Sequence, residues 1–223
     1  MNYEVFAFSF NNPERKARMN ERFARYAEKT INWAESVELT DPRVELSPAD
    51  KRTSAIMFNH LDMIRMFLEG STAEYGVFCE DDIYIRKDFK QSIQVALQAH
   101  TRLSLDVLLA GYLINYKPAS TSYAHGFSEA EPPFVFMSYS DDVWGAQMYI
   151  LDRPAAVKIL DSFSNPVAVS VFNPDWTITK FGRRSVIYPM LALEEGAAPS
   201  GHPAHVLFHN QCKDTHYDTN IFD

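Results

Sequence analysis

The stretch Tyr75-Gly-Val-Phe-Cys-Glu-Asp-Asp-Ile-Tyr-Ile85 places three acidic residues inside what is otherwise an apolar β-strand. The side chains of Glu80, Asp81 and Asp82 repel one another, and burial at the end of an apolar strand disfavours their charged forms. A divalent cation, Mg²⁺ or Mn²⁺, shared with the phosphates of a nucleotide would compensate this charge. The stretch therefore predicts a buried strand that ends in a metal–nucleotide site.

A surface turn and a calcium loop are the other interpretations of this acidic trio. A turn usually has Gly, Asn or Pro after the carboxylates, whereas Ile83-Tyr-Ile85 continues the apolar pattern. A calcium loop spreads its oxygen ligands over about a dozen residues around a central Gly, and this stretch has no such spacing. The metal–nucleotide interpretation is therefore favoured.

The composition fits one globular domain. The chain has 223 residues, of which 46% are hydrophobic, and its net charge of −8 with dispersed Lys and Arg argues against a nucleic-acid partner. No basic segment leads into a long apolar run, so we expect a soluble, cytoplasmic protein without a membrane segment. Its two cysteines, Cys79 and Cys212, have no metal-ligand spacing and suit a reducing compartment.

Strand and helix patterns alternate along the first part of the chain. Residues 3–10 are predicted to form a strand, and Asn11-Asn-Pro-Glu14 then supplies the cap and proline of a helix that extends to about residue 29. Ser47-Pro-Ala-Asp50 starts a second helix, which ends near Gly70. The acidic strand follows directly.

The alternation continues to the C-terminus and predicts an α/β fold. In chain order we expect a helix from Phe89 to Leu97, a strand over Asp106–Ile114, a partly structured binding loop between Asn115 and Asp142, and a strand over Trp144–Leu151. A helix from Asp152, a short helix that opens at Asn173-Pro-Asp-Trp176, a strand over Ser185–Pro189 and a His-rich tail over Pro199–Asp223 follow.

Ligands of open α/β sheets bind outside the carboxyl ends of strands, so the first strand and the acidic strand should end in one crevice. Ser9, Asn11 and Arg15 follow the first strand, where helix N–H groups and a guanidinium favour an anion or a base edge. Arg52 is a second cation for the nucleotide, although long cations usually lie on the surface. Phe8 is a candidate for stacking on the base, although first-strand aromatics more often fill the core.

Four motifs in this order resemble GT-A glycosyltransferases, above all family 25, the lipopolysaccharide and collagen sugar transferases, and the sugar-transferase domains of large algal viruses. They are Asn11-Asn-Pro-Glu-Arg15, Ser54-Ala-Ile-Met-Phe-Asn-His60, Phe78-Cys-Glu-Asp-Asp-Ile83 and Trp144-Gly-Ala-Gln-Met-Tyr-Ile150. The resemblance covers roughly residues 3–195. It departs from the family at Asn59-His60, where the family has Ser-His, and at His209-Asn-Gln-Cys212, where the family has His-x-Asn-Gly.

The resemblance implies a GT-A, Rossmann-like, nucleotide-sugar-binding fold with a mixed central sheet flanked by helices. We expect a single domain over 1–223, with a nucleotide-sugar half of about 1–114 and an acceptor half of about 115–223. The sequence leaves open whether this domain belongs to a longer chain.

Carried over to this chain, the resemblance implies that Asp82 binds a Mn²⁺ or Mg²⁺ ion that bridges a nucleoside diphosphate. Asp81 would then face the ribose or the sugar, Glu80 would support both carboxylates, and Asn59 would lie at the donor site. His209 is the candidate for a third metal ligand, since neutral imidazole binds Mn²⁺. The alternative is a solvated histidine in the tail.

An inverting transfer needs a base on the acceptor side to take the hydroxyl proton. Asp175 is the first candidate and Asp142 the second; the alternatives are a helix N-terminal carboxylate and a loop carboxylate. Trp144 and Gly145 would form part of an acceptor platform, unless Trp144 is a core residue. His60 shares a helix face with apolar residues, so we expect a hydrogen-bonded core histidine.

The sequence thus predicts a metal-dependent, inverting glycosyltransferase of glycan biosynthesis, in the host cytoplasm if the protein is viral. It would move a UDP-linked hexose or deoxyhexose to a hydroxyl group of a glycan or glycoprotein. A non-catalytic nucleotide-sugar or carbohydrate-binding module of the same fold is the alternative. A nucleotidyltransferase is disfavoured, because the first strand is not followed by a glycine-rich phosphate loop.

Overall fold

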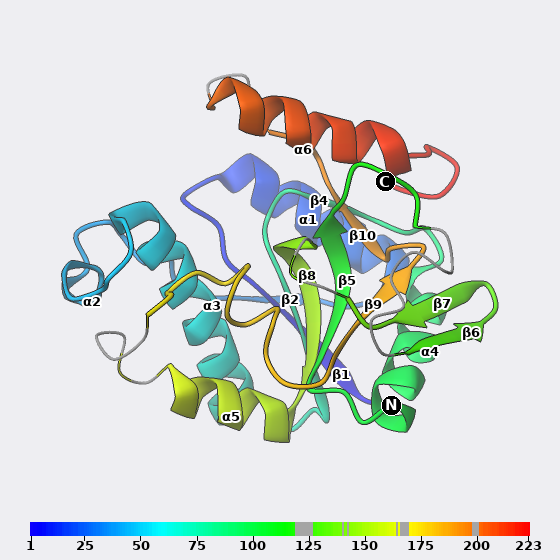
Figure 1. The fold of residues 1–223 in the computed structure, drawn as a ribbon, viewed down its shortest axis with the longest axis horizontal. Helices are drawn as coiled ribbons and strands as arrows, with labels where there is room; N and C mark the ends of the chain where they lie inside the picture. The colour runs from blue at the N-terminus through cyan, green and yellow to red at the C-terminus, as the bar shows by residue number, and fades with distance from the viewer. Residues whose placement is uncertain (119–126, 140, 142, 164, 166–169, 198–200) are drawn as a thin grey trace.

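A mixed eight-stranded sheet forms the centre of the structure, and helices cover both of its faces (Figure 1). The structure is a computed structural model that describes residues 1–118, 127–139, 141, 143–163, 165, 170–197 and 201–223. This arrangement confirms the predicted α/β class with a mixed central sheet flanked by helices. Among the described residues, no helix is both long and apolar enough to cross a membrane.

The strands and helices have the following bounds. The strands are β1 (Tyr3–Ala7), β2 (Ile31–Trp33), β3 (Tyr75–Cys79), β4 (Ile83–Ile85), β5 (Val107–Leu113), β6 (Ser128–Glu131), β7 (Phe134–Met137), β8 (Trp144–Asp152), β9 (Arg184–Tyr188) and β10 (Ala192–Glu194). The helices are α1 (Pro13–Tyr26), α2 (Pro42–Glu45), α3 (Lys51–Gly70), α4 (Phe89–Arg102), α5 (Arg153–Ser162) and α6 (Pro203–His216).

The direction of β8 decides which strand ends meet. The strand order is β2-β1-β3-β8-β5-β9-β7-β6, with β1, β2 and β3 parallel and β8 antiparallel to both of its neighbours. The carboxyl ends of β1, β3 and β5 therefore share one edge with the amino end of β8. Strand β8, from the predicted acceptor half, thus lies between β3 and β5 of the predicted nucleotide-sugar half.

The two faces of the sheet carry two separate hydrophobic cores. Along β1, Phe6 packs with α3 and α5 on one face, while Val5 and Ala7 pack with α1 and α4 on the other. The period-two pattern of a strand buried on both faces explains why β1 and β3 are almost entirely apolar. The acidic residues Glu80, Asp81 and Asp82 therefore come directly after a strand that is buried along its whole length.

The predicted helix starts are confirmed by side-chain caps. The Oδ1 atoms of Asn12, Asp50 and Asp152 accept hydrogen bonds from the backbone N–H groups three residues further on, at 3.0, 3.1 and 2.8 Å. Each cap pairs an N–H group that the helix itself leaves unpaired. These local signals are readable in the sequence, and the helices begin where they predict.

Two sequence expectations are corrected. The short helix expected to open at Asn173-Pro-Asp-Trp176 is wrong: residues 174–180 form turns, in which the Thr177 and Thr179 hydroxyls donate to backbone carbonyls at 2.6 and 2.7 Å and so compete with a helix. The His-rich tail contains the helix α6, which lies across the edge of the sheet where β5 ends (Figure 1).

The stretch between Asn115 and Asp142 is partly structured as expected: it includes the β6–β7 hairpin, in which β7 pairs with β9.

Arg153 ties α5 to the end of α3. Its guanidinium donates to the carbonyls of Leu68 and Ser71 at 2.8 and 3.0 Å and lies 5.1 Å from the centroid of the Phe67 ring. Helix α3 has no basic residue of its own in its last turn, so Arg153 supplies the charge that the helix end favours.

We expect Arg153→Met to lower the free energy of unfolding by about 2 kcal/mol, because charge-assisted hydrogen bonds to carbonyls of α3 are lost. Urea denaturation followed by circular dichroism measures this change. Lys158→Met, on the same helix but at an exposed ion pair with Asp106, should cost clearly less than Arg153→Met. Equal losses in the two variants would contradict the helix-end role of Arg153.

Candidate active site

The acidic trio lies at the carboxyl end of β3, beside the residues that follow β1. Arg15 donates through Nη1 to Asp81 and to Asp82, at 3.1 Å in both cases, and the hydroxyl of buried Ser9 donates to Asp81. The other oxygen of Asp82, Oδ1, is buried and has no hydrogen-bond partner among the described residues. One half of the Asp82 carboxylate is therefore unpaired.

Glu194 is a fourth acidic residue of this cluster, and sequence reasoning missed it. Strand β10 pairs antiparallel with β4, with Glu194 opposite Ile83, so its carboxylate arrives next to the acidic trio. His209 on α6 donates through Nδ1 to both Glu194 oxygens, at 2.9 and 2.7 Å, and this bond raises the pKa of His209. The signal in the sequence is the apolar run Leu191-Ala-Leu that ends in two glutamates.

The carboxylates of the cluster oppose one another's ionisation. Burial raises the pKa of Glu80 to about 8, with added repulsion from Asp175 and Glu194. Burial and the charges of Glu80 and Glu194 also raise the pKa of Asp82, against the opposing effect of Arg15. Such mutually raised pKa values are typical of sites that receive a cation or transfer a proton.

His60 confirms the prediction of a hydrogen-bonded core histidine. Its ring is fully buried, Nδ1 lies 3.1 Å from the Tyr149 hydroxyl, and burial lowers its pKa to about 4. Its second nitrogen, Nε2, lies 3.7 Å from Glu80 Oε1 without a hydrogen bond. The neutral His60 ring is therefore buried next to the Glu80 carboxyl group.

Two adjoining hollows of about 500 and 610 Å³ open at this cluster. Both are lined by Arg52, Asp82, Glu194, His205 and His209. The first is also lined by Arg15, Gly196, Ala197, Gly201, His202 and Val206. The second is also lined by Ile56, Glu80, Leu113, Trp144, Gln147, Asn173, Asp175 and Phe208. Arg52 thus borders both hollows, Arg15 only the first, and aromatic and amide side chains only the second.

Most of the sequence-predicted site residues are brought together here. Glu80, Asp82, Arg15, Arg52, Asp175 and His209 line the hollows, with Ser9 and Asp81 bonded directly behind them. Besides Ser9 and Asp81, three further predicted donor-site residues line neither hollow. Phe8 is buried against Phe10 and His60 in the core, and Asn11 is exposed and donates to Glu38 at 3.1 Å.

Asn59 is also predicted to lie at the donor site, and it lines neither hollow. Its side chain is fully buried, accepts from Val37 N at 2.9 Å and donates to the Ala55 carbonyl at 2.9 Å. Its amide is thus used to join α3 to the segment after β2. The second predicted base, Asp142, lies outside the described residues.

The donor groups at the cluster fit a divalent cation that is partly coordinated by a ligand. Among the described residues, no three His, Cys, Asp or Glu side chains lie close enough together to hold a metal ion. Mg²⁺ usually takes one or two carboxylates and completes its shell with phosphate oxygens and water. The unpaired Oδ1 of Asp82, with Glu80 and His209 lining the same hollow, suits that kind of binding.

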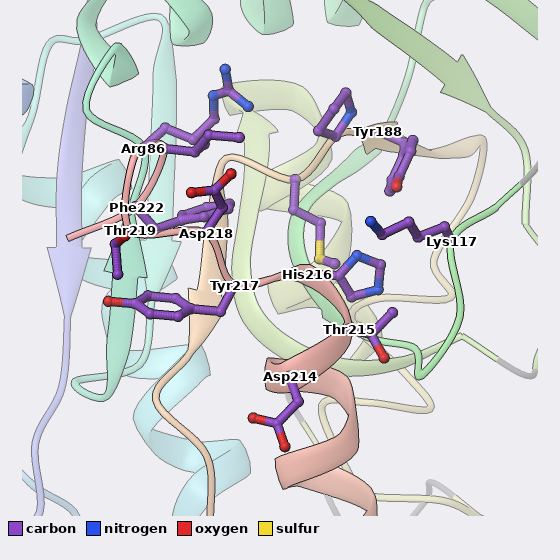
Figure 2. Close-up of a pocket in the computed structure, with 13 residues that line it drawn as sticks. Arg86, Lys117, Tyr188, Asp214, Thr215, His216, Tyr217, Asp218, Thr219 and Phe222 are labelled. Carbon is purple, nitrogen blue, oxygen red and sulfur yellow. The ribbon is translucent and has the colours of Figure 1, made fainter.

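Another cavity, of about 540 Å³, lies where the end of α6 meets Arg86 and Tyr188 (Figure 2). Figure 2 shows Lys117 beside His216 and Tyr188 on one side of it. Its main polar groups are already paired: Arg86 with Asp88 at 2.7 Å, and His216 Nε2 with the Ile114 carbonyl at 3.1 Å. These contacts hold the C-terminal segment in place.

By sequence, the chain matches no family model and no curated protein. By structure, it is similar to a glycosyltransferase involved in the glycosylation of the major capsid of PBCV-1, at 12% identity and a TM-score of 0.47, over 83% of this chain and 81% of that one. It is also similar to A197 from STIV, at 14% identity and a TM-score of 0.43, over 91% and 100% of the two chains. TarS from S. aureus matches at 15% identity and a TM-score of 0.43, over 83% and 58%.

We expect Glu80→Gln to stabilise the protein at pH 8 in the presence of EDTA by about 1 kcal/mol. The raised pKa of Glu80 means that the folded state keeps a proton that the unfolded state loses above about pH 4.5, so wild-type stability falls between pH 4.5 and 8. The expected change in the free energy of unfolding is small because 26% of the Glu80 side chain is exposed, and solvent screens its charge. Urea denaturation at pH 5 and pH 8 measures the difference.

Glu195→Gln is the matched control. Glu195 pairs with Arg18 and Arg22, and these partners hold its pKa below the usual value. Its contribution is present above about pH 4.5 and is lost as the pH falls, so Glu195→Gln should destabilise at pH 8. A stabilising Glu195→Gln, or a Glu80→Gln change that is the same at both pH values, would contradict this electrostatic description.

Proposed function

We propose that this chain is a GT-A glycosyltransferase that uses a divalent cation and a nucleoside-diphosphate sugar, with UDP as the first nucleotide to test. The observation that carries the proposal is the buried carboxylate cluster at the edge of the sheet, with Asp82 Oδ1 unpaired. Binding of a cation lowers the electrostatic repulsion within such a cluster. The phosphate oxygens of a diphosphate then supply further ligands of the cation.

The donor diphosphate belongs on the side of Arg15 and Arg52. Both guanidinium groups line the first hollow, and Arg15 already contacts Asp81 and Asp82. Arginine binds phosphate through paired N–H groups, so Arg15 can hold the diphosphate and the carboxylates together. Mn²⁺ or Mg²⁺ held by Asp82, with Glu80 or His209 as a second protein ligand and phosphate and water as the others, would neutralise charge on the leaving diphosphate.

The acceptor hydroxyl belongs on the side of Asp175, which lines the second hollow together with Glu80. Burial raises the pKa of Asp175, while the nearby His60 and Lys180 oppose the rise. A carboxylate with a raised pKa takes a proton more readily, which suits the base that removes the hydroxyl proton during attack on the anomeric carbon. We propose inversion at that carbon, with a hexose or deoxyhexose as the transferred sugar.

We expect wild type to bind UDP in the presence of Mn²⁺ and to lose this binding in EDTA. Asp82→Asn should weaken UDP binding at least about a hundredfold, because the cation loses its unpaired carboxylate oxygen. Calorimetric titration measures both effects. Asp62→Asn is the control: this α3 carboxylate pairs with Arg43 and Arg65 and lines neither hollow, so UDP binding should be unchanged. Absence of UDP binding under every condition would overturn the proposal.

We expect Asp175→Asn to lower the rate of sugar transfer about 10²- to 10⁴-fold while leaving UDP affinity within about threefold of wild type. Transfer from a panel of UDP-sugars to neutral methyl glycosides, followed by mass spectrometry, measures the rate. Asp161→Asn, at an exposed position of α5, is the control. A non-catalytic binding module would bind UDP and show no transfer in wild type, and that result would replace the enzyme with the alternative.

A further inference from the structure

Two exposed tryptophans pack against each other beside the second hollow: Trp144 lines the hollow, and Trp176 contacts Trp144. Trp144 and Trp176 meet edge to face, with ring centroids 4.7 Å apart and planes at 81°, and they are 41% and 38% exposed. In this geometry each ring keeps at least one face that the other does not cover. The Lys180 ammonium lies 5.7 Å from the centroid of Trp176 and 5.2 Å from that of Tyr139, and it donates to the Val143 carbonyl.

The backbone at Trp144 is shaped by a bulge. The β5–β8 pairing shifts register between Leu109 and Leu113, and Leu113 pairs with Trp144 at the end of the ladder. Gly145 has φ +89°, and a Cβ at this position would overlap the Gln147 amide. Because bulges re-aim side chains, this glycine allows Trp144 to face solvent while Gln147 stays beneath it.

Gln147 provides a second, independent observation at the same place. Its side chain is 5% exposed and lines the hollow, yet its Oε1 atom has no hydrogen-bond partner among the described residues. A buried amide oxygen without a partner costs free energy unless a ligand or a water molecule pairs with it. A hydroxyl group that enters the hollow beside Trp144 would satisfy this oxygen.

We propose that Trp144, Trp176 and Gln147 form an acceptor subsite for one neutral pyranose ring. The apolar face of the sugar lies on Trp144, and one of its hydroxyls donates to Gln147 Oε1. This inference rests on the proposed function and adds the acceptor class to it. Asp175 lines the same hollow, so a second hydroxyl of the bound ring comes within the region of the proposed base.

The charges at the subsite favour a neutral sugar over an acidic one. The hollow is lined by four carboxylates, Glu80, Asp82, Asp175 and Glu194, against one guanidinium, Arg52, and two histidines, His205 and His209. The Lys180 ammonium lies at the Trp176 ring. Carboxylates outnumber the permanent cations there, so the carboxylate of a uronic or sialic acid would meet net repulsion.

The test uses tryptophan emission in the full chain carrying Trp33→Phe. Trp33 lies on β2, bonds to Asn20 and lines neither hollow, so its removal leaves Trp144 and Trp176 as the two emitting tryptophans. The probes are the methyl glycosides of glucose, galactose, mannose and fucose, and of glucuronic acid. Each is titrated with and without UDP and Mn²⁺.

We expect a saturable change in emission with at least one neutral glycoside and at least about tenfold weaker binding of the glucuronide. In calorimetric titrations, Gln147→Leu and Trp144→Ala should each weaken binding of that neutral glycoside at least about tenfold and leave UDP binding unchanged. Trp33→Phe alone should leave glycoside binding as in wild type.

Two results would overturn the subsite: no saturation with any neutral glycoside while UDP binding is intact, or neutral-glycoside binding that neither Gln147→Leu nor Trp144→Ala weakens. Saturation by a neutral glycoside in a protein that never binds UDP would keep the subsite and overturn the donor site instead. The two proposals therefore fail separately.

Discussion

The structure of the candidate site depends on holding several carboxylates close together at the end of a buried strand. Glu80 and Asp82 follow β3, and Glu194 arrives on β10. Burial and mutual repulsion raise the pKa values of Glu80 and Asp82, so their charged forms oppose folding. Arg15 and His209 offset part of that cost.

The mixed sheet brings the site together from distant segments. Because β8 runs antiparallel between β3 and β5, its first residues lie at the edge where β3 ends. The same edge receives the helix start after β1 and the short β4–β10 pair. Helix α6 lies across it (Figure 1) and brings His209 to Glu194. Arg15, which borders the first hollow, and Trp144 and Gln147, which border the second, thus come from different parts of the chain.

The two sides of the cavity suit the two partners of a sugar transfer. Guanidinium groups line the hollow proposed for the diphosphate, and an exposed tryptophan with neutral amides lines the hollow proposed for the acceptor. The shared carboxylates separate a strongly charged ligand from a neutral one. In the proposed reaction, the leaving diphosphate and the attacking hydroxyl would then be held on opposite sides of one cluster.

The sequence by itself determined the α/β class, the helix starts at Asn12, Asp50 and Asp152, and the strand that ends in Glu80-Asp81-Asp82. These features depend on local patterns of capping, proline and apolar spacing, which act within a few residues. Only the tertiary structure decided that Glu194 joins the trio, that the Asn59 amide bonds to the backbone, and that Gln147 Oε1 is buried without a hydrogen-bond partner in the described part of the chain. The physical reason is that pairing between distant strands and burial of polar atoms are set by residues far apart in the chain, which no local pattern records.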